Sequence, residues 1–411
     1  MNPYIQYMYS YPHKTAYGPL VGVYLKDYAD RLSDSENSLY FHIPFCKSKC
    51  GYCNLFSVVG QDEAFMEKYV DAMERQVMQW AEVLPQDIKY ADLTLGGGTP
   101  LLLPEKQLER IFLMAEKQMG FHGETKRTIV ETSPGQTTKE KLYLLKEHHV
   151  TRVSMGVQSF HEEELKTINR SHTAEQVERA MDWIRQVGFS CVNLDLIYGI
   201  PGQTRKSLVQ SVNRALEWEP EELFVYPLYI REGTYLSKQA VKKPEDMYGM
   251  YLYIREYLQE KGYTPYSMRR FVKNGNVSNL GSCGFGNTVS VGCGGRSYIG
   301  NLHFCTPFGV KQGDCMEILQ QYIMQQDYLT IRHGYLLSKE EQKRRYVIKN
   351  ILFGGGLSEE EYQDEFLENV MTDFPILQEW TMKNYAYRKQ GKIMLTETGF
   401  SLSDYLGPML T

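Results

Sequence analysis

Three cysteines lie close together in the first part of the chain, and their spacing indicates a metal site. Cys46, Cys50 and Cys53 form a C-x3-C-x2-C run. Clustered thiolates suit a [4Fe–4S] cluster, which normally has four protein ligands. Three ligands leave one iron free for a small molecule to chelate. We therefore predict an open [4Fe–4S] cluster held by these three residues.

Two other interpretations of the run stay open. A structural zinc site needs four ligands, usually from a second C-x2-C knuckle, and the chain has none. A redox C-x-x-C pair at Cys50 and Cys53 would leave Cys46 unexplained. The remaining cysteines are isolated, and buried free thiols are the default expectation for them; they are Cys191, Cys283, Cys293, Cys305 and Cys315.

A glycine-rich segment adds a second signal. Residues 92–100 read Asp-Leu-Thr-Leu-Gly-Gly-Gly-Thr-Pro, a short strand that runs into a turn. Glycines let backbone N–H and C=O groups approach a ligand without a Cβ in the way. Alone, the segment is an ordinary tight turn. Together with the cysteine run, it resembles the radical S-adenosylmethionine (SAM) enzymes, in which SAM chelates the open iron.

The elements that must position these residues alternate along the chain. Strand-like runs are expected near residues 38–43, 90–95, 127–131, 151–156, 191–197 and 223–229, with helical patterns between them. Thr137 with Glu140 and Thr173 with Gln176 fit capping boxes, and Thr204 fits a further N-cap. This alternation predicts an α/β fold, an incomplete (β/α)6 barrel with its chemistry at the carboxyl ends of the strands.

Further boundaries follow from changes in pattern. We expect an N-terminal arm (1–37), the partial barrel (38–237), a C-terminal α+β extension (238–335) and a helical cap (336–411) that ends in a winged-helix-like hairpin. The net charge of −5 gives no sign of nucleic-acid binding. No apolar run reaches the length of a membrane span, and no secretory signal is evident, so a cytoplasmic protein is expected.

The motifs taken in order resemble the oxygen-independent coproporphyrinogen III dehydrogenase family, the HemN-like radical SAM proteins. The resemblance covers about residues 39–298. Its landmarks are Tyr-Phe-His-Ile-Pro-Phe-Cys at 40–46, Gly-Gly-Gly-Thr-Pro at 96–100, Ser-Met-Gly-Val-Gln-Ser-Phe at 154–160, Asn-Arg at 169–170, and Leu-Asp-Leu-Ile-Tyr-Gly-Ile-Pro-Gly-Gln-Thr at 194–204.

The resemblance implies a set of SAM contacts. These are Tyr40, Tyr52, Gly97, Gly98, Thr99, Glu131, Gln158, Arg170 and Asp195, with Ile197 near a second SAM in some members. Arg170 suits a bidentate pair with the SAM carboxylate. Each residue alone is also compatible with a satisfied polar group in a barrel core. For His42, a hydrogen-bonded core histidine is the better interpretation.

The chain departs from the family in two segments. The dehydrogenases carry a fourth cysteine where this chain has Leu55, which puts porphyrinogen decarboxylation in doubt. The heme-chaperone branch has a His-Asn-x-x-Tyr-Trp motif, which falls here on 278–283, Ser-Asn-Leu-Gly-Ser-Cys, and this counts against heme carriage. Four arginines are candidates to bind an anionic substrate or to lie on a solvated surface: Arg231, Arg269, Arg270 and Arg296.

The resulting hypothesis is an enzyme that cleaves SAM reductively at a [4Fe–4S] cluster. The 5′-deoxyadenosyl radical then takes hydrogen from an anionic small molecule or a carrier-bound group. The catalytic residue that meets the substrate stays unidentified. A donor such as flavodoxin or ferredoxin would supply the electron. Three alternatives stay open: a C-methyltransferase that uses two SAM molecules, a coproporphyrinogen III dehydrogenase, and a heme-binding chaperone.

Overall fold

The computed structural model describes residues 2–8, 10–33, 36–273 and 286–411, and the chain forms two compact units. The larger unit comprises Tyr17–Met247 and Gly281–Leu336. The smaller unit comprises Met1–Ala16, Tyr248–Leu280 and Leu337–Thr411. Each unit is described separately below.

The larger unit is built on a sheet whose central strands are parallel and follow the chain. These strands are β2 (Glu36–Ile43), β5 (Lys89–Gly97), β6 (Arg127–Thr132), β7 (Arg152–Gln158), β8 (Cys191–Tyr198) and β9 (Glu222–Pro227), and they are neighbours in this order. Parallel neighbours need crossover connections, which helices supply here. The six predicted strands of the α/β fold are thereby confirmed.

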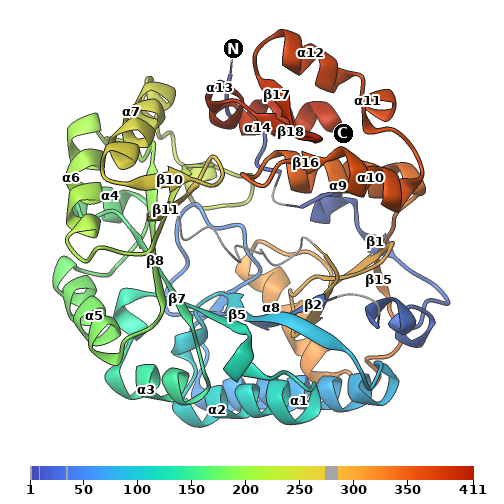
Figure 1. The fold of residues 1–411 in the computed structure, drawn as a ribbon. Coiled ribbons are helices and arrows are strands. Elements are labelled where there is room, and N and C mark those ends of the chain that lie inside the picture. Colours follow the sequence, from blue (N-terminus) through green and yellow to red (C-terminus); the bar gives the residue numbers. More distant parts are fainter. Residues whose placement is uncertain (1, 9, 34–35, 274–285) are drawn as a thin grey trace. The chain divides into compact units, whose positions relative to one another are not determined.

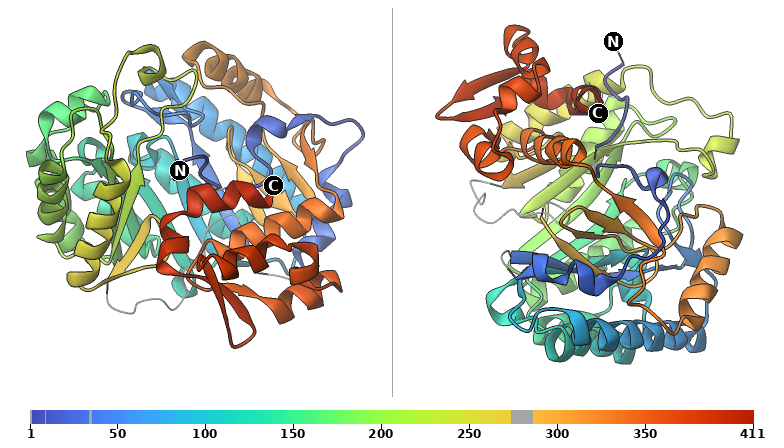
Figure 2. Two further views of the ribbon diagram at one scale, coloured as in Figure 1. Left: turned by 90° about the horizontal axis from the view of Figure 1, so that it is seen from above. Right: turned by 90° about the vertical axis from the view of Figure 1, so that its right-hand side faces the viewer.

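Helices connect the strands and cover the outer side of this sheet (Figures 1 and 2). They are α1 (Glu63–Val83), α2 (Glu105–Leu113), α3 (Lys139–Glu147), α4 (Glu162–Thr167), α5 (Ala174–Val187) and α6 (Arg205–Leu216). The six carboxyl ends of the strands consequently share one edge of the sheet, which is where barrel chemistry lies.

Helix α5 shows how the sequence specifies these elements. Thr173 and Gln176 form the predicted capping box, and Gly188 ends the helix in the left-handed region at φ 76°. Its buried residues recur at helical spacing and pack toward the sheet: Val177, Ala180, Met181 and Ile184.

One predicted cap was wrong by one residue. The N-cap of α3 is Thr138, whose side chain accepts from the Lys141 backbone N–H. The hydroxyl of Thr137 instead donates to the Ser133 carbonyl at 3.0 Å and lies 3.0 Å from the Thr132 hydroxyl. Thr137 and Thr138 are adjacent candidates for the N-cap. The hydroxyl of the buried Thr137 is already hydrogen-bonded to the preceding turn, so Thr138 caps the helix.

A second set of strands extends the sheet on the far side of β2. Strand β12 (Thr288–Val291) pairs parallel with β2, and antiparallel pairs continue the sheet through β13 (Ser297–Ile299), β14 (Leu302–Phe304), β15 (His333–Leu336) and β1 (Gly18–Pro19). The sequence predicted an α+β extension in this region without indicating that its strands continue the barrel sheet.

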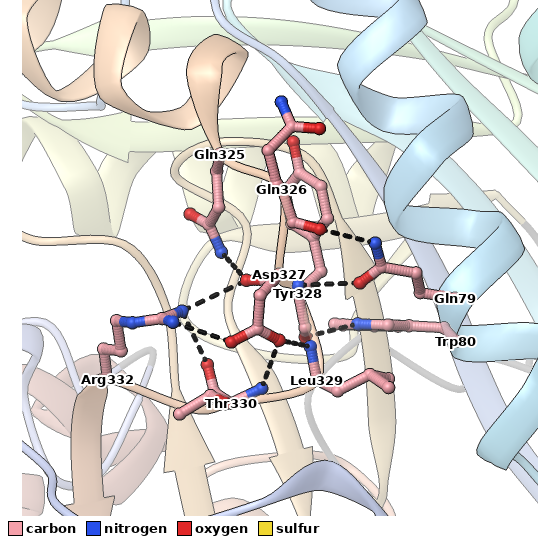
Figure 3. Close-up of polar contacts among 9 residues, drawn as sticks. All are labelled: Gln79, Trp80, Gln325, Gln326, Asp327, Tyr328, Leu329, Thr330 and Arg332. Carbon is pink, nitrogen blue, oxygen red and sulfur yellow. Dashed lines mark hydrogen bonds and ion pairs between the residues drawn. The ribbon is translucent and has the colours of Figure 1, made fainter.

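The segment after α8 (Gln312–Met324) is joined to α1 by the polar contacts in Figure 3. The Trp80 indole N–H donates to the Tyr328 carbonyl at 3.0 Å, and the Gln79 side-chain amide donates to the Gln326 carbonyl and accepts from the Tyr328 N–H. Asp327 accepts from two backbone N–H groups and pairs with Arg332 at 2.7 Å. These contacts attach the added strands to the long helix behind β2.

The smaller unit contains α7 (Met247–Glu260), the antiparallel pair β10 (Tyr263–Pro265) and β11 (Arg270–Lys273), and the C-terminal tail. The tail has α9 (Lys339–Ile351), α10 (Glu359–Phe366), α11 (Val370–Asp373) and α12 (Ile376–Met382), then a sheet of β16 (Leu357–Ser358), β18 (Lys392–Leu395) and β17 (Ala386–Lys389), and finally α13 (Glu397–Ser401) and α14 (Ser403–Leu406). The predicted hairpin is present, with Gln390 and Gly391 both at positive φ. Its winged-helix character stays a prediction.

Candidate functional site

The three cysteines of the predicted cluster lie on one loop after β2. Cys46 ends the short strand β3 (Phe45–Cys46), which pairs with β4 (Val58–Val59). This pairing holds the two ends of the cysteine loop close together. Burial, followed by the Cys50 charge, raises the pKa of Cys46, and the same two causes raise the pKa of Cys53 to about 12. Bound metal would reverse these shifts, because a cation favours thiolates.

Backbone contacts hold the middle of this loop. The Asn169 side-chain amide donates to the Lys49 carbonyl at 2.8 Å, and the Gly51 N–H donates to the Ile168 carbonyl at 2.8 Å. The Leu236 N–H donates to the Gly51 carbonyl, also at 2.8 Å. The thiols therefore sit on a loop whose path is fixed by the barrel at two points.

The number of thiols bears on the choice of metal. Cys46, Cys50 and Cys53 provide three free thiols on one loop. A structural zinc ion takes four donors. In a [4Fe–4S] cluster each cysteine binds its own iron, so three cysteines leave one iron for another ligand. Three thiols therefore suit an open cluster.

The glycine-rich segment packs against the cysteine loop. The Gly98 N–H donates to the Ile43 carbonyl at 2.7 Å, and the Thr99 N–H donates to the Phe45 carbonyl at 2.8 Å. A Cβ on Gly98 would lie 2.6 Å from the Phe45 oxygen and 3.0 Å from Cys46 Sγ. Only glycine leaves room for this close approach. The two predicted motifs thus form one structure at the ends of β2 and β5.

The preceding glycine connects this turn to a carboxylate. Gly97 has φ 118°, and its N–H donates to Glu131 Oε2 at 3.1 Å. The His42 ring lies where a Gly97 Cβ would be, 2.6 Å away. That ring is buried, with Nε2 3.1 Å from the Phe56 carbonyl oxygen and Nδ1 3.2 Å from the Tyr40 hydroxyl. The expectation of a hydrogen-bonded core histidine at His42 is confirmed.

Two carboxyl groups come from strands β6 and β8. Desolvation, with a further contribution from the Asp195 charge, raises the pKa of Glu131 to about 7. Desolvation also raises the pKa of Asp195 to about 6, against the hydrogen bond that Asn193 donates to it at 2.7 Å. The Glu131 side chain is nevertheless exposed to solvent on one side, so a ligand can reach its carboxyl group. Both groups would ionise more readily beside a cation.

Arg170 connects the cysteine loop with strand β7. Its Nη1 donates to Cys50 Sγ at 3.3 Å and its Nη2 donates to the Gly156 carbonyl. Its Nε is buried and has no partner. Gln158, at φ 72° on a strand irregularity, places its amide where a Gly156 Cβ would otherwise be. An orphaned guanidinium N–H beside the cysteine loop fits an anionic ligand such as a carboxylate.

An apolar cluster lies beside these polar groups. Ile197 is buried with Ile168, Ile200, Leu228 and Leu236, and the half-buried Tyr52 and Tyr226 pack against them. Burial and the Cys50 charge raise the pKa of the Tyr52 hydroxyl well above its usual value. The positions predicted for Tyr52 and Ile197 therefore share one surface next to the cysteines.

The four candidate substrate arginines fall in different surroundings. In the larger unit, half-buried Arg231 and Arg296 lie over the rings of Tyr229 and Tyr298, at 4.7 and 6.0 Å. These contacts leave the substrate hypothesis for both arginines as a prediction.

In the smaller unit, Arg269 and Arg270 are buried. Arg269 pairs with the equally buried Asp404 and lies 3.7 Å from the Tyr7 ring centroid, while Arg270 lies over the Tyr266 ring. The charge of Arg269 is thus compensated within its own unit, and this placement favours a structural role over substrate binding.

The isolated cysteines of the larger unit differ in burial. Cys293 and Cys315 are fully buried, whereas Cys191 and Cys305 are partly accessible. Burial raises the pKa of Cys293, so its thiol stays protonated. Cys283, and with it the position of the heme motif, lies outside the described residues.

One group of functional interest was missed by the sequence reasoning. Buried Glu164 accepts from the hydroxyls of Ser159 and Ser207 at 2.7 and 2.5 Å, and from the Gln203 amide at 3.0 Å. Gln203 in turn donates to the Ile197 carbonyl and accepts from the Gly199 N–H. The Pro-Gly-Gln-Thr motif at 201–204 was the available signal.

Comparisons with known proteins identify the domain that contains these residues. Residues 40–215 match the model of the radical SAM superfamily. The chain is 28% identical to a protein of Bacillus subtilis named heme chaperone HemW, over 88% of this chain and 96% of that protein. It is 26% identical to the oxygen-independent coproporphyrinogen III oxidase of Escherichia coli, over 84% of this chain and 80% of that protein.

A solved structure shows the same fold. The coproporphyrinogen III oxidase (HemN) of Escherichia coli superimposes with a TM-score of 0.81, at 22% identity, over 94% of this chain and 92% of that chain. Residues 40–215 therefore form a radical SAM domain, the domain of enzymes that use a [4Fe–4S] cluster and SAM. The relatives of the chain are the proteins named HemN and HemW. In the part of the chain that the structure describes, no helix is long and apolar enough to cross a bilayer.

Proposed function

We propose that this enzyme binds a [4Fe–4S] cluster through Cys46, Cys50 and Cys53, and SAM beside it. When bound, this pair of cofactors supplies a 5′-deoxyadenosyl radical that abstracts hydrogen from a substrate. The observation that carries the proposal is the meeting of the cysteine loop, the Gly97–Gly98 backbone and two perturbed carboxyls at the carboxyl ends of neighbouring strands.

The chain's own residues have distinct roles in this proposal. The free Nε of Arg170 would bind the SAM carboxylate. Glu131 and Asp195 would offset the sulfonium charge or accept from ribose hydroxyls, with Gln158 as a further contact. The Gly97, Gly98 and Thr99 backbone would contact the methionine part of SAM. The side chains of Tyr40, Tyr52 and Ile197 would form the apolar wall of the SAM site.

The test is anaerobic reconstitution with iron and sulfide, followed by dithionite and SAM. We expect 5′-deoxyadenosine from the wild-type protein and neither cluster nor product from the Cys46→Ala, Cys50→Ala and Cys53→Ala variants. Cys191→Ala is the matched control, because Cys191 begins β8 at the other end of the sheet. Zinc in place of iron in the wild-type protein would contradict the proposal.

The substrate is proposed to be a small anion or a carrier-bound anionic group, on the basis of Arg231 and Arg296 in the larger unit. An oxidative decarboxylation like that of coproporphyrinogen III oxidase is the first reaction to test, and the exposed Leu55 on the cysteine loop is the residue that sets this chain apart. S-adenosylhomocysteine formed beside 5′-deoxyadenosine would instead indicate methyl transfer with a second SAM.

Heme binding is a second candidate function, favoured by the similarity to HemW over nearly the whole chain. The segment at 278–283 lacks the histidine and both aromatics of the heme motif. We therefore expect a hemin titration to give no Soret shift. A stoichiometric shift would favour a heme carrier over an enzyme that acts on a free small molecule.

A low-potential flavodoxin or ferredoxin in the cytoplasm is the proposed electron donor.

A further inference from the structure

The segment that follows strand β9, residues 228–243, lies beside the cysteine loop. Its first residue is held to the end of β8, because the Leu228 N–H donates to the Tyr198 carbonyl at 2.8 Å. Farther along, the Leu236 N–H donates to the Gly51 carbonyl, also at 2.8 Å. The segment is therefore attached to the carboxyl ends of the strands and to the loop that carries the three cysteines.

This segment brings two cationic side chains near each other. The Lys243 ammonium donates to the Leu228 carbonyl at 3.3 Å, and the Arg231 guanidinium lies 4.7 Å from the centroid of the Tyr229 ring. Burial, followed by the Arg231 charge, lowers the pKa of Lys243, so each charge acts on the other. Both residues are partly accessible to solvent, and a ligand can therefore reach them.

No carboxylate balances these two charges. Among the residues that the structure describes, neither Arg231 nor Lys243 forms an ion pair with an aspartate or a glutamate. Other arginines of the larger unit do have such partners; Arg152 pairs with Glu222 and Arg185 with Glu221. Partly desolvated like charges cost free energy, and groups perturbed in this way concentrate at functional sites. The pair consequently suits an anionic ligand.

The charge of the pair favours a dianion. A phosphate monoester carries about −1.5 to −2 charges at pH 7 and has three strong acceptor oxygens. One such group would compensate both cations, because a guanidinium can bind it through two parallel hydrogen bonds and an ammonium as a point charge. A single carboxylate would compensate one cation and leave the other without a counter-charge. The pair therefore matches a phosphate monoester better than a carboxylate.

Apolar side chains lie beside the two cations. Ile230 and Val241 stand within two residues of the pair in the sequence. Both are partly accessible and pack against the apolar cluster that contains Ile197. Tyr52 of the cysteine loop packs against the same cluster. A ligand whose phosphate lay at the pair could thus extend its carbon skeleton along an apolar surface toward the cysteine loop.

We propose that Arg231 and Lys243 bind a phosphate group of the substrate, whose carbon skeleton lies against Ile230 and Val241; this role rests on the proposed function. Lys243 thereby becomes a substrate-binding residue that the sequence did not indicate. The substrate is a phosphate monoester with an apolar portion that reaches the site of radical formation.

Isothermal titration of the full-length, cluster-loaded protein with SAM bound, at constant ionic strength, tests this role. Hexyl phosphate is the probe, hexanoate has a similar chain with one charge, and hexanol is the neutral control. We expect hexyl phosphate to bind about tenfold more tightly than hexanoate, and hexanol not to bind. Arg231→Gln and Lys243→Met should each weaken the binding of hexyl phosphate about tenfold, since each removes one charge-assisted contact.

Two further variants separate the role from a loss of folding. Lys242→Met is the matched control, because Lys242 is the exposed neighbour of Lys243, and it should leave the affinity unchanged. Lys243→Arg keeps the charge and should retain most of the binding, with the thermal stability of the wild type.

Three results would overturn the proposal: no binding of hexyl phosphate, binding that neither Arg231→Gln nor Lys243→Met weakens, and hexanoate binding as tightly as hexyl phosphate. The titration and the 5′-deoxyadenosine assay fail separately. Protein that forms 5′-deoxyadenosine but does not bind the probe would overturn the phosphate subsite alone. Protein that binds the probe through the pair but forms no 5′-deoxyadenosine would contradict the proposed function and, with it, the role in substrate binding.

Discussion

The two carboxyls at the proposed SAM site, Glu131 and Asp195, predict that SAM affinity rises with pH. In the free enzyme Glu131 has a pKa of about 7 and Asp195 a pKa of about 6. A sulfonium cation beside them favours the ionised forms, so binding releases protons. Between pH 6 and 8 the ionised fraction of Glu131 rises about tenfold and that of Asp195 about twofold. We therefore expect the dissociation constant to fall about twentyfold over this range.

The assay is calorimetry of SAM binding to the anaerobic, cluster-loaded protein, in buffers of different ionisation enthalpy that report proton release. The Glu131→Gln/Asp195→Asn double variant is the control. Because SAM's own α-amino group titrates near pH 8, the carboxyls' contribution is the difference between the two proteins. A wild-type pH profile that matches the double variant's would refute the assignment of these residues to the sulfonium.

The same pKa values also predict how the stability of the ligand-free protein changes with pH. Since the folded state raises both pKa values above those of the unfolded chain, the folded state binds more protons between about pH 4 and 7. Glu131 and Asp195 contribute to the free energy of unfolding at pH values below their pKa in the unfolded chain. This contribution declines as pH rises through their pKa values in the folded protein. The ligand-free protein should lose part of this stability by pH 7.5, and the double variant should lose less.

Three further perturbations test other parts of the structure. Gly98→Ala places a methyl 2.6 Å from a carbonyl oxygen and should abolish cluster incorporation, measured as iron content, whereas Gly313→Ala in α8 meets open space and should not. Glu164→Ala removes three hydrogen bonds to a buried carboxylate and should lower the free energy of unfolding in urea by about 3 kcal/mol. Arg269→Met removes the cationic partner of the buried Asp404 carboxylate, and should destabilise the protein by about 3–5 kcal/mol without weakening SAM binding.

The strand and helix order was predictable because its signals are local. Each barrel strand is a short apolar run bounded by turn residues, and Thr173 and Thr204 cap their helices as expected. The position of the site followed from topology, since parallel strands bring their carboxyl ends to one edge. Gly98 illustrates the gain from structure: the sequence gives a flexible turn, and the structure shows which atoms forbid a side chain.

The features that the sequence did not predict depend on contacts between residues far apart in the chain. Strand β12 joins β2 across about 250 residues of chain, and Arg269 meets Asp404 at a separation of 135 residues. No periodicity encodes either pairing. The network of Glu164 was missed because this glutamate stands at an exposed-looking helix start, and the Pro-Gly-Gln-Thr motif at 201–204 contains only one of its partners, Gln203. Adjacent Thr137 and Thr138 could be separated only by knowing which hydroxyl the preceding turn occupies.

We propose that the loop of Cys46, Cys50 and Cys53 holds a [4Fe–4S] cluster with one iron open to SAM. Mössbauer spectroscopy of protein reconstituted with iron-57, recorded before and after SAM is added, distinguishes an open iron from one bound by the protein. We expect one iron of the four to change its isomer shift on SAM binding. Zinc in the purified protein, or iron whose spectrum is indifferent to SAM, would contradict it.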